Sequence, residues 1–166
     1  MNDGNGPIAP PSNHPRRDSA TRQRLGSGCG RVLVVDDDRT VRDVLASMLR
    51  ELGYDAVTVS SGEEAIGIYT ALEHAIDLVV LDMVMPGGLD GYDTFRGLRA
   101  VRGDAKVVLC SGYADGDRIG RALEEGALTF LPKPFDLAQV ASVVHKALRA
   151  ERDDSPSSPR ARTLNR

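Results

Sequence analysis

The sequence predicts an α/β protein built on one open, doubly wound parallel sheet of five strands. Three observations predict this fold. From residue 31 to residue 150, short aliphatic runs alternate with longer segments whose apolar residues recur at helical spacing. The short runs are apolar at nearly every position, which is typical of strands that are buried on both faces. The alternation itself implies crossover connections, and therefore a parallel sheet that helices cover on both sides.

Five short runs are the predicted strands. They are residues 31–35 (RVLVV), 55–60 (DAVTVS), 77–81 (DLVVL), 106–110 (KVVLC) and 128–131 (LTFL). Right-handed crossovers place the carboxyl end of every such strand at one edge of the sheet. Because ligands of open α/β sheets bind at that edge, the residues that follow the strands are the first candidates for function.

Five segments between and after these strands are the predicted helices. Apolar residues from 41 to 52 follow helical spacing, and Gly53 ends that helix. Ser61 and Glu64 have the spacing of a capping box, which places the start of the second helix there. The remaining helices are predicted at residues 91–101, 115–125 and 135–151.

The composition is that of a globular protein with an aliphatic core. Of the 166 residues, 41% are hydrophobic but 4% are aromatic, and Trp is absent. No stretch approaches the ~20 apolar residues of a membrane span, and the N-terminus lacks the apolar run of a secretory signal. We therefore expect a cytoplasmic protein without a membrane partner. Cys29 and Cys110 lack the spacing of a metal site, and Cys110 is predicted to be a buried thiol.

The two ends of the chain differ from its middle. Residues 1–30 are rich in Pro and Gly, and neither they nor residues 152–166 show an apolar period. Both are predicted to be disordered tails, which leaves residues 31–151 as one folded domain. The tails are slightly basic and the net charge is −3, so the folded part is acidic. An acidic domain argues against nucleic-acid binding, and we expect no DNA-binding domain.

Polar residues follow four of the five predicted strands. They are Asp36, Asp37 and Asp38 after the first strand, Asp82 after the third, Ser111 after the fourth and Lys133 after the fifth. Each has an ordinary alternative role, as a turn residue, a turn hydroxyl or a solvated charge. Because parallel strands end at a common edge, these side chains are expected to converge, and their combination there is hard to explain by turns alone.

The carboxylates of Asp36, Asp37 and Asp82 would repel one another in a partly buried site. A hard divalent cation offsets such repulsion, and Mg²⁺ typically takes one or two carboxylates together with water and phosphate oxygens. Helix capping is the alternative role for acids at this place, and Asp38 is the best candidate for capping alone. The sequence therefore predicts a metal site, with Lys133 as a second, fixed cation.

Asp82 is the predicted nucleophile of this site. Aspartate carboxylates form acyl phosphates, and a phosphoryl group in transfer spreads negative charge over its equatorial oxygens. The metal, the Lys133 ammonium group, and the Ser111 hydroxyl with a backbone N–H would each hold one of these oxygens. The residues thus favour a protein that accepts a phosphoryl group on Asp82.

Four motifs resemble the receiver domain of two-component response regulators. They are VLVVDDD (32–38), DLVVLDMVMPGGLDG (77–91), VVLCSGYA (107–114) and FLPKPFD (130–136). The resemblance covers about residues 31–150 and implies a flavodoxin-like fold. It also implies phosphorylation of Asp82 by a histidine kinase or a histidine phosphotransfer protein, and a switch in binding to a downstream protein that the sequence does not identify. The domain would be no ordinary enzyme, because it would catalyse transfer to its own Asp and lose the phosphoryl group slowly.

The resemblance further implies roles for single residues. The Val84 backbone carbonyl would bind the metal, Mg²⁺ or Mn²⁺, beside the three carboxylates. Ser111 would be the switch hydroxyl, Phe130 the switch aromatic residue and Lys133 a phosphoryl-binding lysine. Val84 and Tyr113 lie where the family tunes hydrolysis, and an apolar Val84 cannot position an attacking water. We therefore expect a long-lived phosphoryl state, in a monomer or in a dimer that forms on phosphorylation.

Some features depart from the family pattern. The loop MPGGLDG (85–91) is one residue longer than the usual form, and Phe130 stands where Tyr is frequent. The SGYA run resembles receivers of hybrid histidine kinases, yet no kinase or output segment is evident, so a single-domain response regulator is expected.

Two alternatives remain open. The first is a pseudo-receiver that binds partners without accepting phosphate, and the full set of acids with Ser111 and Lys133 disfavours it. The second is a haloacid dehalogenase-type aspartyl-phosphate phosphatase, with Asp36 and Asp38 as its DxD pair. The residues that flank this pair are wrong for such an enzyme, and no cap-sized insertion is present.

Overall fold

The computed structural model describes residues 30–72, 75–112 and 116–149. The predicted tails apart from Gly30, and also Tyr113, lie outside these residues; Cys29 is part of the N-terminal tail. Within them strands and helices alternate in the predicted order: β1 (Arg31–Val35), α2 (Arg39–Glu51), β2 (Asp55–Val59), α3 (Gly62–Leu72), β3 (Leu78–Asp82), α4 (Gly91–Val101), β4 (Val107–Ser111), α5 (Gly116–Glu124), β5 (Thr129–Pro132) and α6 (Leu137–Arg149). None of these helices is long and apolar enough to pass through a bilayer.

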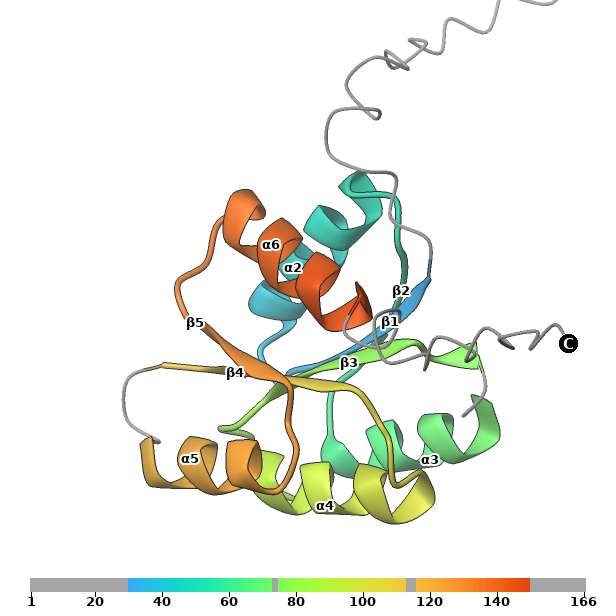
Figure 1. The fold of residues 1–166 in the computed structure, drawn as a ribbon, viewed down its shortest axis with the longest axis vertical. Helices are drawn as coiled ribbons and strands as arrows, with labels where there is room; N and C mark the ends of the chain where they lie inside the picture. The colour runs from blue at the N-terminus through green and yellow to red at the C-terminus, as the bar shows by residue number, and fades with distance from the viewer. Residues whose placement is uncertain (1–29, 73–74, 113–115, 150–166) are drawn as a thin grey trace, which may run out of the picture.

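The strands form one parallel sheet with the order β2-β1-β3-β4-β5. Helices α2 and α6 cover one face of the sheet, and α3, α4 and α5 cover the other (Figure 1). The doubly wound α/β fold is therefore confirmed. The strand order changes direction between β1 and β3, and open α/β sheets form their binding crevice at such a switch point.

Each face of the sheet has its own apolar core. Leu33 and Val35 of β1 pack in the cluster formed with α3, α4 and α5, whereas Val32 and Val34 pack in the cluster formed with α2 and α6. Burial on both faces explains why the strand sequences are continuously apolar. The buried thiol of Cys110 belongs to the second cluster, as predicted.

The starts of α2 and α3 are capped by the residues that the sequence predicts. The Asp38 carboxylate accepts hydrogen bonds from the N–H groups of Val41 at 3.3 Å and Thr40 at 2.7 Å. These hydrogen bonds lower the pKa of Asp38, so this acid is occupied as the N-cap of α2. At α3, the Glu64 N–H donates to the Ser61 hydroxyl at 3.2 Å, as in a capping box.

Three strands end one residue later than predicted. The strands β3, β4 and β5 end at Asp82, Ser111 and Pro132. The sequence predicts each of these residues in the loop that follows its strand. The cause is that the parallel ladder continues, since the Lys133 N–H donates to the Ser111 carbonyl at 2.8 Å. The functional side chains are therefore anchored in the sheet itself.

Helix α6 begins at Leu137, later than the predicted start at residue 135. The Asp136 carboxylate accepts a hydrogen bond from the Gln139 N–H at 2.8 Å and so acts as a cap just before the helix. The helix is described as far as Arg149.

Candidate functional site

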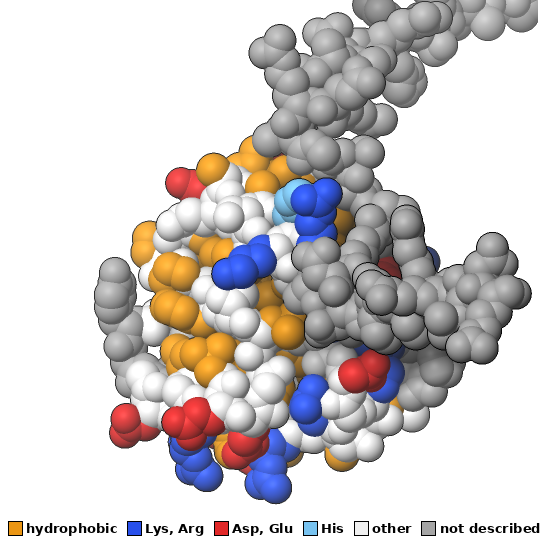
Figure 2. Space-filling view, viewed as in Figure 1, with side chains coloured by type: hydrophobic (Ala, Val, Ile, Leu, Met, Phe, Trp, Pro, Cys, Tyr) orange, Lys and Arg blue, Asp and Glu red, His pale blue; other side chains and the backbone are white. Residues whose placement is uncertain are grey.

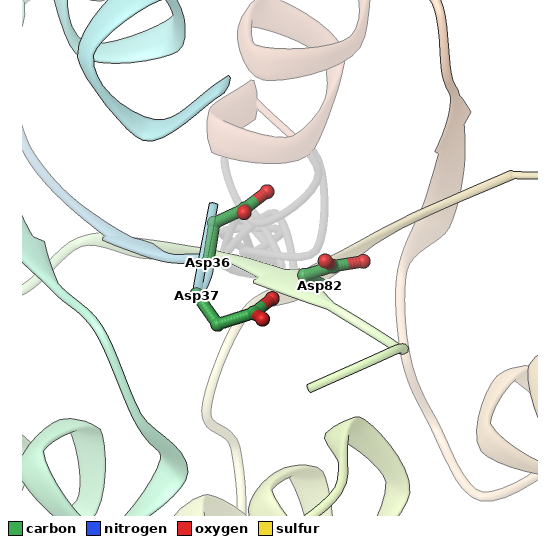
Figure 3. Close-up of side chains that lie close together, drawn as sticks. All are labelled: Asp36, Asp37 and Asp82. Atoms are coloured by element: carbon green, nitrogen blue, oxygen red, sulfur yellow. The ribbon is translucent and has the colours of Figure 1, made fainter. Parts of the chain in front are cut away.

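Three carboxylates meet at the switch point between β1 and β3 (Figure 3). Asp36 and Asp37 directly follow β1, and Asp82 is the last residue of the neighbouring β3. One carboxylate oxygen from each of the three lies within 4.8 Å of the others. Asp36 and Asp82 are 2% and 4% exposed, whereas Asp37 is open to solvent. The cluster is thus reachable from outside, although two of its members are buried.

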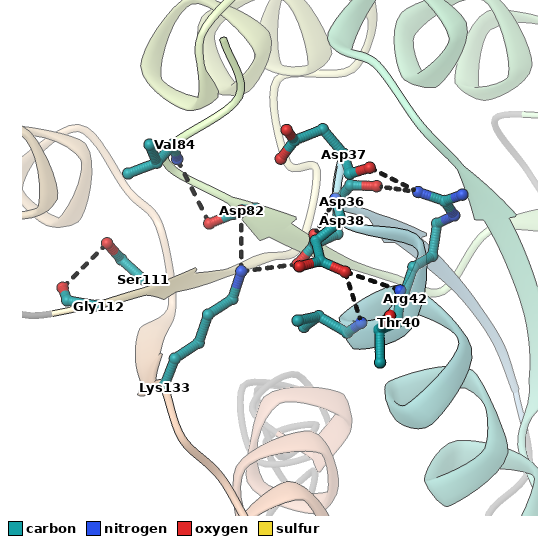
Figure 4. A network of polar contacts seen from close by, with 11 residues as sticks. Asp36, Asp37, Asp38, Thr40, Arg42, Asp82, Val84, Ser111, Gly112 and Lys133 are labelled. Atoms are coloured by element: carbon teal, nitrogen blue, oxygen red, sulfur yellow. Dashed lines mark hydrogen bonds and ion pairs between the residues drawn. The ribbon is translucent and has the colours of Figure 1, made fainter.

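Lys133, from the turn after β5, reaches across the sheet edge to two of these acids (Figure 4). Its Nζ atom donates to Asp36 Oδ2 at 2.7 Å and to Asp82 Oδ2 at 2.8 Å. Burial alone would lower the pKa of Lys133, but the hydrogen bonds and negative charges of the two carboxylates outweigh burial and raise it. Lys133 is therefore a fixed positive charge at neutral pH.

Both oxygens of Asp82 have partners. Oδ2 accepts from Lys133, and Oδ1 accepts from the Val84 N–H at 3.3 Å. Burial nevertheless raises the pKa of Asp82 above its ordinary value, with a further contribution from the charge of Asp36, while Lys133 acts in the opposite direction. The ammonium group of Lys133 thus only partly offsets the cost of burying the negative charge of Asp82.

Ser111 is the last residue of β4, on the side of β3 away from β1. Its side chain is 1% exposed. The hydroxyl donates to the Gly112 carbonyl at 3.1 Å (Figure 4). The site therefore combines three carboxylates, one ammonium group and one buried hydroxyl at the carboxyl ends of four parallel strands.

Comparison with known proteins identifies the family. The sequence profile of the response regulator receiver domain matches residues 32–145, more than half of the chain. The chain belongs to this family. The receiver domain is a phosphoacceptor module of two-component signalling and a signalling domain rather than a classical enzyme.

Relatives of this receiver domain differ greatly in length. Sporulation initiation phosphotransferase F of Bacillus subtilis is 32% identical over 118 residues, which cover 71% of this chain and 93% of that protein. The sensor kinase CckA of Brucella abortus is 40% identical over 126 residues, which cover 75% of this chain but 13% of the kinase. Among solved structures, the CheX–CheY–BeF₃–Mg complex of Borrelia burgdorferi is similar with a TM-score of 0.66 and 30% identity, covering 70% of this chain and 87% of that one.

Of the other predicted site residues of the receiver domain, one lies next to the acid cluster, one lies within β5 and one is outside the described residues. Val84 follows the acid cluster in the β3–α4 loop, with its side chain 51% exposed and its N–H bonded to Asp82. Phe130 lies within β5 and is 38% exposed, so it is partly open to solvent in this structure. The tuning position Tyr113 falls outside the described residues.

Arg42 is a functional neighbour that the sequence reasoning missed. Its guanidinium Nη1 atom donates to the backbone carbonyls of Asp36 and, at 3.3 Å, of Asp37 (Figure 4). The side chain thereby ties the first turn of α2 to the segment that carries two of the three acids. Its position one helical turn after the N-cap Asp38 was a usable signal, because a long side chain there can reach the preceding loop.

Proposed function

We propose that this receiver domain accepts a phosphoryl group on Asp82 from the phosphohistidine of a histidine kinase or a histidine phosphotransfer protein. The observation that carries the proposal is the pair of hydrogen bonds from Lys133 to Asp36 and Asp82, beside the open carboxylate of Asp37. These contacts hold a nucleophilic carboxylate next to a fixed positive charge at an accessible sheet edge.

The donor set fits a divalent metal ion. Within the described cluster, Lys133 supplies one positive charge against the three carboxylates of Asp36, Asp37 and Asp82. Carboxylate and carbonyl oxygens are the ligands that Mg²⁺ and Mn²⁺ prefer. We assign the metal to these three acids and to the Val84 backbone carbonyl. The similar CheX–CheY complex contains Mg²⁺. The metal would neutralise charge on the incoming phosphoryl group.

The transfer that we propose is catalysed by the receiver domain itself. An Asp82 carboxylate oxygen attacks phosphorus, the P–N bond of the phosphohistidine breaks, and its electron pair stays on the imidazole nitrogen. The product is an acyl phosphate on Asp82 and a free histidine on the donor. Lys133 stabilises negative charge on one transferring oxygen, and the Ser111 hydroxyl turns from the Gly112 carbonyl to donate to another.

The same step is proposed to switch the surface around β5. Movement of Ser111 would vacate space that the partly exposed Phe130 ring fills, and this would repack the face formed by α5, β5 and α6. Hydrophobic side chains already gather over the β5 and α6 side of the molecule (Figure 2). Leu128 and Phe130 in this region are 39% and 38% exposed. This face is the proposed contact for the downstream protein.

The phosphodonor is proposed to dock against α2, next to the acid cluster. Val44 of α2 is 44% exposed and provides an apolar contact there. The exposed, apolar side chain of Val84 has no group that could orient an attacking water toward the acyl phosphate. We therefore propose slow loss of the phosphoryl group, in minutes to hours rather than seconds.

The test is phosphorylation of the purified chain with a small-molecule phosphodonor in Mg²⁺. Intact-mass measurement is expected to find one phosphoryl adduct per chain on the wild-type protein and none on Asp82→Asn. Asp43→Asn is the matched control, because Asp43 is an exposed acid of α2 whose ion pair with Arg39 lies outside the site. Equal labelling of Asp82→Asn would remove the assignment, and a wild-type protein that takes no label would favour a pseudo-receiver.

A further inference from the structure

Two adjacent glutamates at the start of α3 have different partners. Glu64 caps its own helix, since its Oε2 atom accepts from the Ser60 N–H at 2.9 Å. The Glu63 carboxylate instead leaves the helix, and its Oε1 atom accepts from the N–H of Leu89 at 2.9 Å. Leu89 lies in the loop between β3 and α4, 26 residues further along the chain. Glu63 therefore joins α3 to the loop that begins directly after Asp82.

This β3–α4 loop is closed at its base. A Cβ atom on Gly91 would lie 2.3 Å from Met83 Cα and 2.4 Å from the Asp82 carbonyl oxygen, so only glycine permits this approach of the two loop ends. Near its start, the Val84 N–H donates to Asp82 Oδ1 at 3.3 Å. The hydrogen bond to Asp82 holds the Val84 N–H at the start of the loop, whereas the direction of the Val84 carbonyl depends on the loop residues that follow.

The middle of the loop has little conformational constraint of its own. Gly87 adopts φ +97°, no atom lies within 4 Å of the position that its Cβ would take, and Gly88 follows it. Two consecutive glycines have large conformational freedom. Leu89, whose N–H donates to Glu63, directly follows these two glycines, so this contact restricts the loop next to its most flexible part.

The fit between α3 and this loop is tight. A Cβ atom on Gly88 would lie 2.8 Å from Glu63 Oε1 and 3.0 Å from Oε2. A Cβ atom on Gly62 would lie 2.0 Å from the Thr94 hydroxyl and 2.9 Å from Leu89 Cβ. Hydrogen bonds from its own N–H and from that of Leu89 lower the pKa of Glu63, which leaves an anion as the acceptor at neutral pH.

We propose that Glu63 is a positioning residue: it fixes the β3–α4 loop through Leu89 and thereby fixes the Val84 carbonyl toward the metal site. The inference rests on the proposed function, because it assigns Val84 to the metal. Glu63 touches neither the metal nor the phosphoryl group, and its effect is exerted through the position of the loop.

The test compares Glu63→Ala with Glu63→Gln in the full chain, by calorimetric titration with Mg²⁺ and by hydrogen exchange of the Leu89 amide. Glu63→Ala is expected to weaken Mg²⁺ binding about 10-fold, as for groups that orient metal ligands. The Leu89 amide should exchange about 10-fold faster, because it loses a charge-assisted hydrogen bond. Glu63→Gln retains an acceptor oxygen and should stay within about twofold of wild type in both measurements.

Two further variants separate positioning from general stability. Glu64→Ala removes the adjacent glutamate, which caps α3. This variant is expected to lower the melting temperature without changing the Mg²⁺ affinity. Gly88→Ala crowds the Glu63 carboxylate and should weaken Mg²⁺ binding, but should have no further effect in a Glu63→Ala background.

The outcomes distinguish this inference from the function on which it rests. Wild-type protein that binds Mg²⁺, together with Glu63→Ala that binds it equally well, overturns the positioning role and leaves the proposed function intact. Wild-type protein that binds no Mg²⁺ overturns both. Additive effects of Gly88→Ala and Glu63→Ala would also count against the inference.

Discussion

The Nζ atom of Lys133 lies 2.7 Å from Asp36 Oδ2 and 2.8 Å from Asp82 Oδ2, and so bridges two buried acids at the ends of the neighbouring strands β1 and β3. Lys133 itself follows β5, at the far side of the sheet. One ammonium group thus reduces the repulsion between two carboxylates and remains close enough to hold an oxygen of a transferring phosphoryl group.

Lys133→Met is predicted to slow phosphorylation of Asp82 by a small phosphodonor about 100-fold, because a charge that stabilises the transferring oxygens is removed. Mg²⁺ affinity should be maintained or increased, since a competing cation is lost from the cluster. Rates from mass-resolved time courses at saturating Mg²⁺ check this. Lys146→Met, at an exposed lysine of α6, is the control. Phosphorylation of Lys133→Met at the wild-type rate would refute the role of Lys133.

Mg²⁺ is predicted to stabilise the folded domain. A ligand that binds the native state alone, at about 100 times its dissociation constant, raises the free energy of unfolding by about 2.7 kcal/mol. Urea unfolding with Mg²⁺ and with a chelator measures this difference. Asp82→Asn should lose most of the stabilisation. If Asp82→Asn gained as much as the wild-type protein, Asp82 would not be a metal ligand.

The raised pKa of Asp82 predicts a pH dependence in the absence of metal. Above the ordinary carboxyl pKa of about 4, and up to the raised pKa of the folded state, the folded protein retains a proton that the unfolded chain has lost. The contribution of this group to stability therefore falls as pH rises through that window. An Asn at position 82 cannot titrate, so Asp82→Asn lacks this loss of stability. The free energy of unfolding of Asp82→Asn minus that of wild type should therefore increase with pH. A difference that is constant or decreases from pH 4 to pH 7 would contradict the prediction.

Gly91→Ala is predicted to destabilise the domain by about 3 kcal/mol. The added Cβ would lie 2.3 Å from Met83 Cα and 2.4 Å from the Asp82 carbonyl oxygen, and backbone atoms cannot move aside as a flexible side chain can. Denaturant unfolding measures the effect. Gly103→Ala is the matched control, because no atom lies within 4 Å of its Cβ position. Equal stability of the two variants would show that the loop base is not closed in this way.

Cys110 is predicted to be unreactive in the folded protein. Burial raises the pKa of its thiol to about 12, and the side chain is 1% exposed, so very little thiolate is present or accessible at pH 8. In a Cys29→Ser background, alkylation of Cys110 should proceed at the rate of global unfolding. Alkylation as fast as that of a free thiol would contradict this placement.

The arrangement of the acid cluster could be predicted from the sequence because it depends on topology. Asp36, Asp82 and Lys133 each stand at the end of an apolar run, and parallel strands bring such ends together whatever the details of packing. The capping roles of Asp38 and Ser61 were also predictable, because they depend on residues two or three positions apart.

Other contacts could not be predicted, because they depend on how separate elements pack. The Glu63–Leu89 hydrogen bond depends on the path of a loop with two glycines, which no periodicity describes. The hydrogen bond from the Tyr92 hydroxyl to Glu125 joins α4 to the turn after α5, so it depends on the distance between these helices and on the rotation of each about its axis. Strand ends were displaced by one residue because ladder hydrogen bonds extend past the apolar run, as at Ser111.

Locating the phosphoryl group on the chain decides whether Asp82 is the phosphoacceptor. After phosphorylation in Mg²⁺, borohydride reduces an aspartyl phosphate to homoserine, and peptide mass spectrometry then identifies the residue that was modified. Homoserine is expected at position 82 and not at positions 36 and 37. Homoserine at another acid, or a phosphoryl group that survives as an ester or phosphohistidine elsewhere, would contradict Asp82 as the phosphoacceptor.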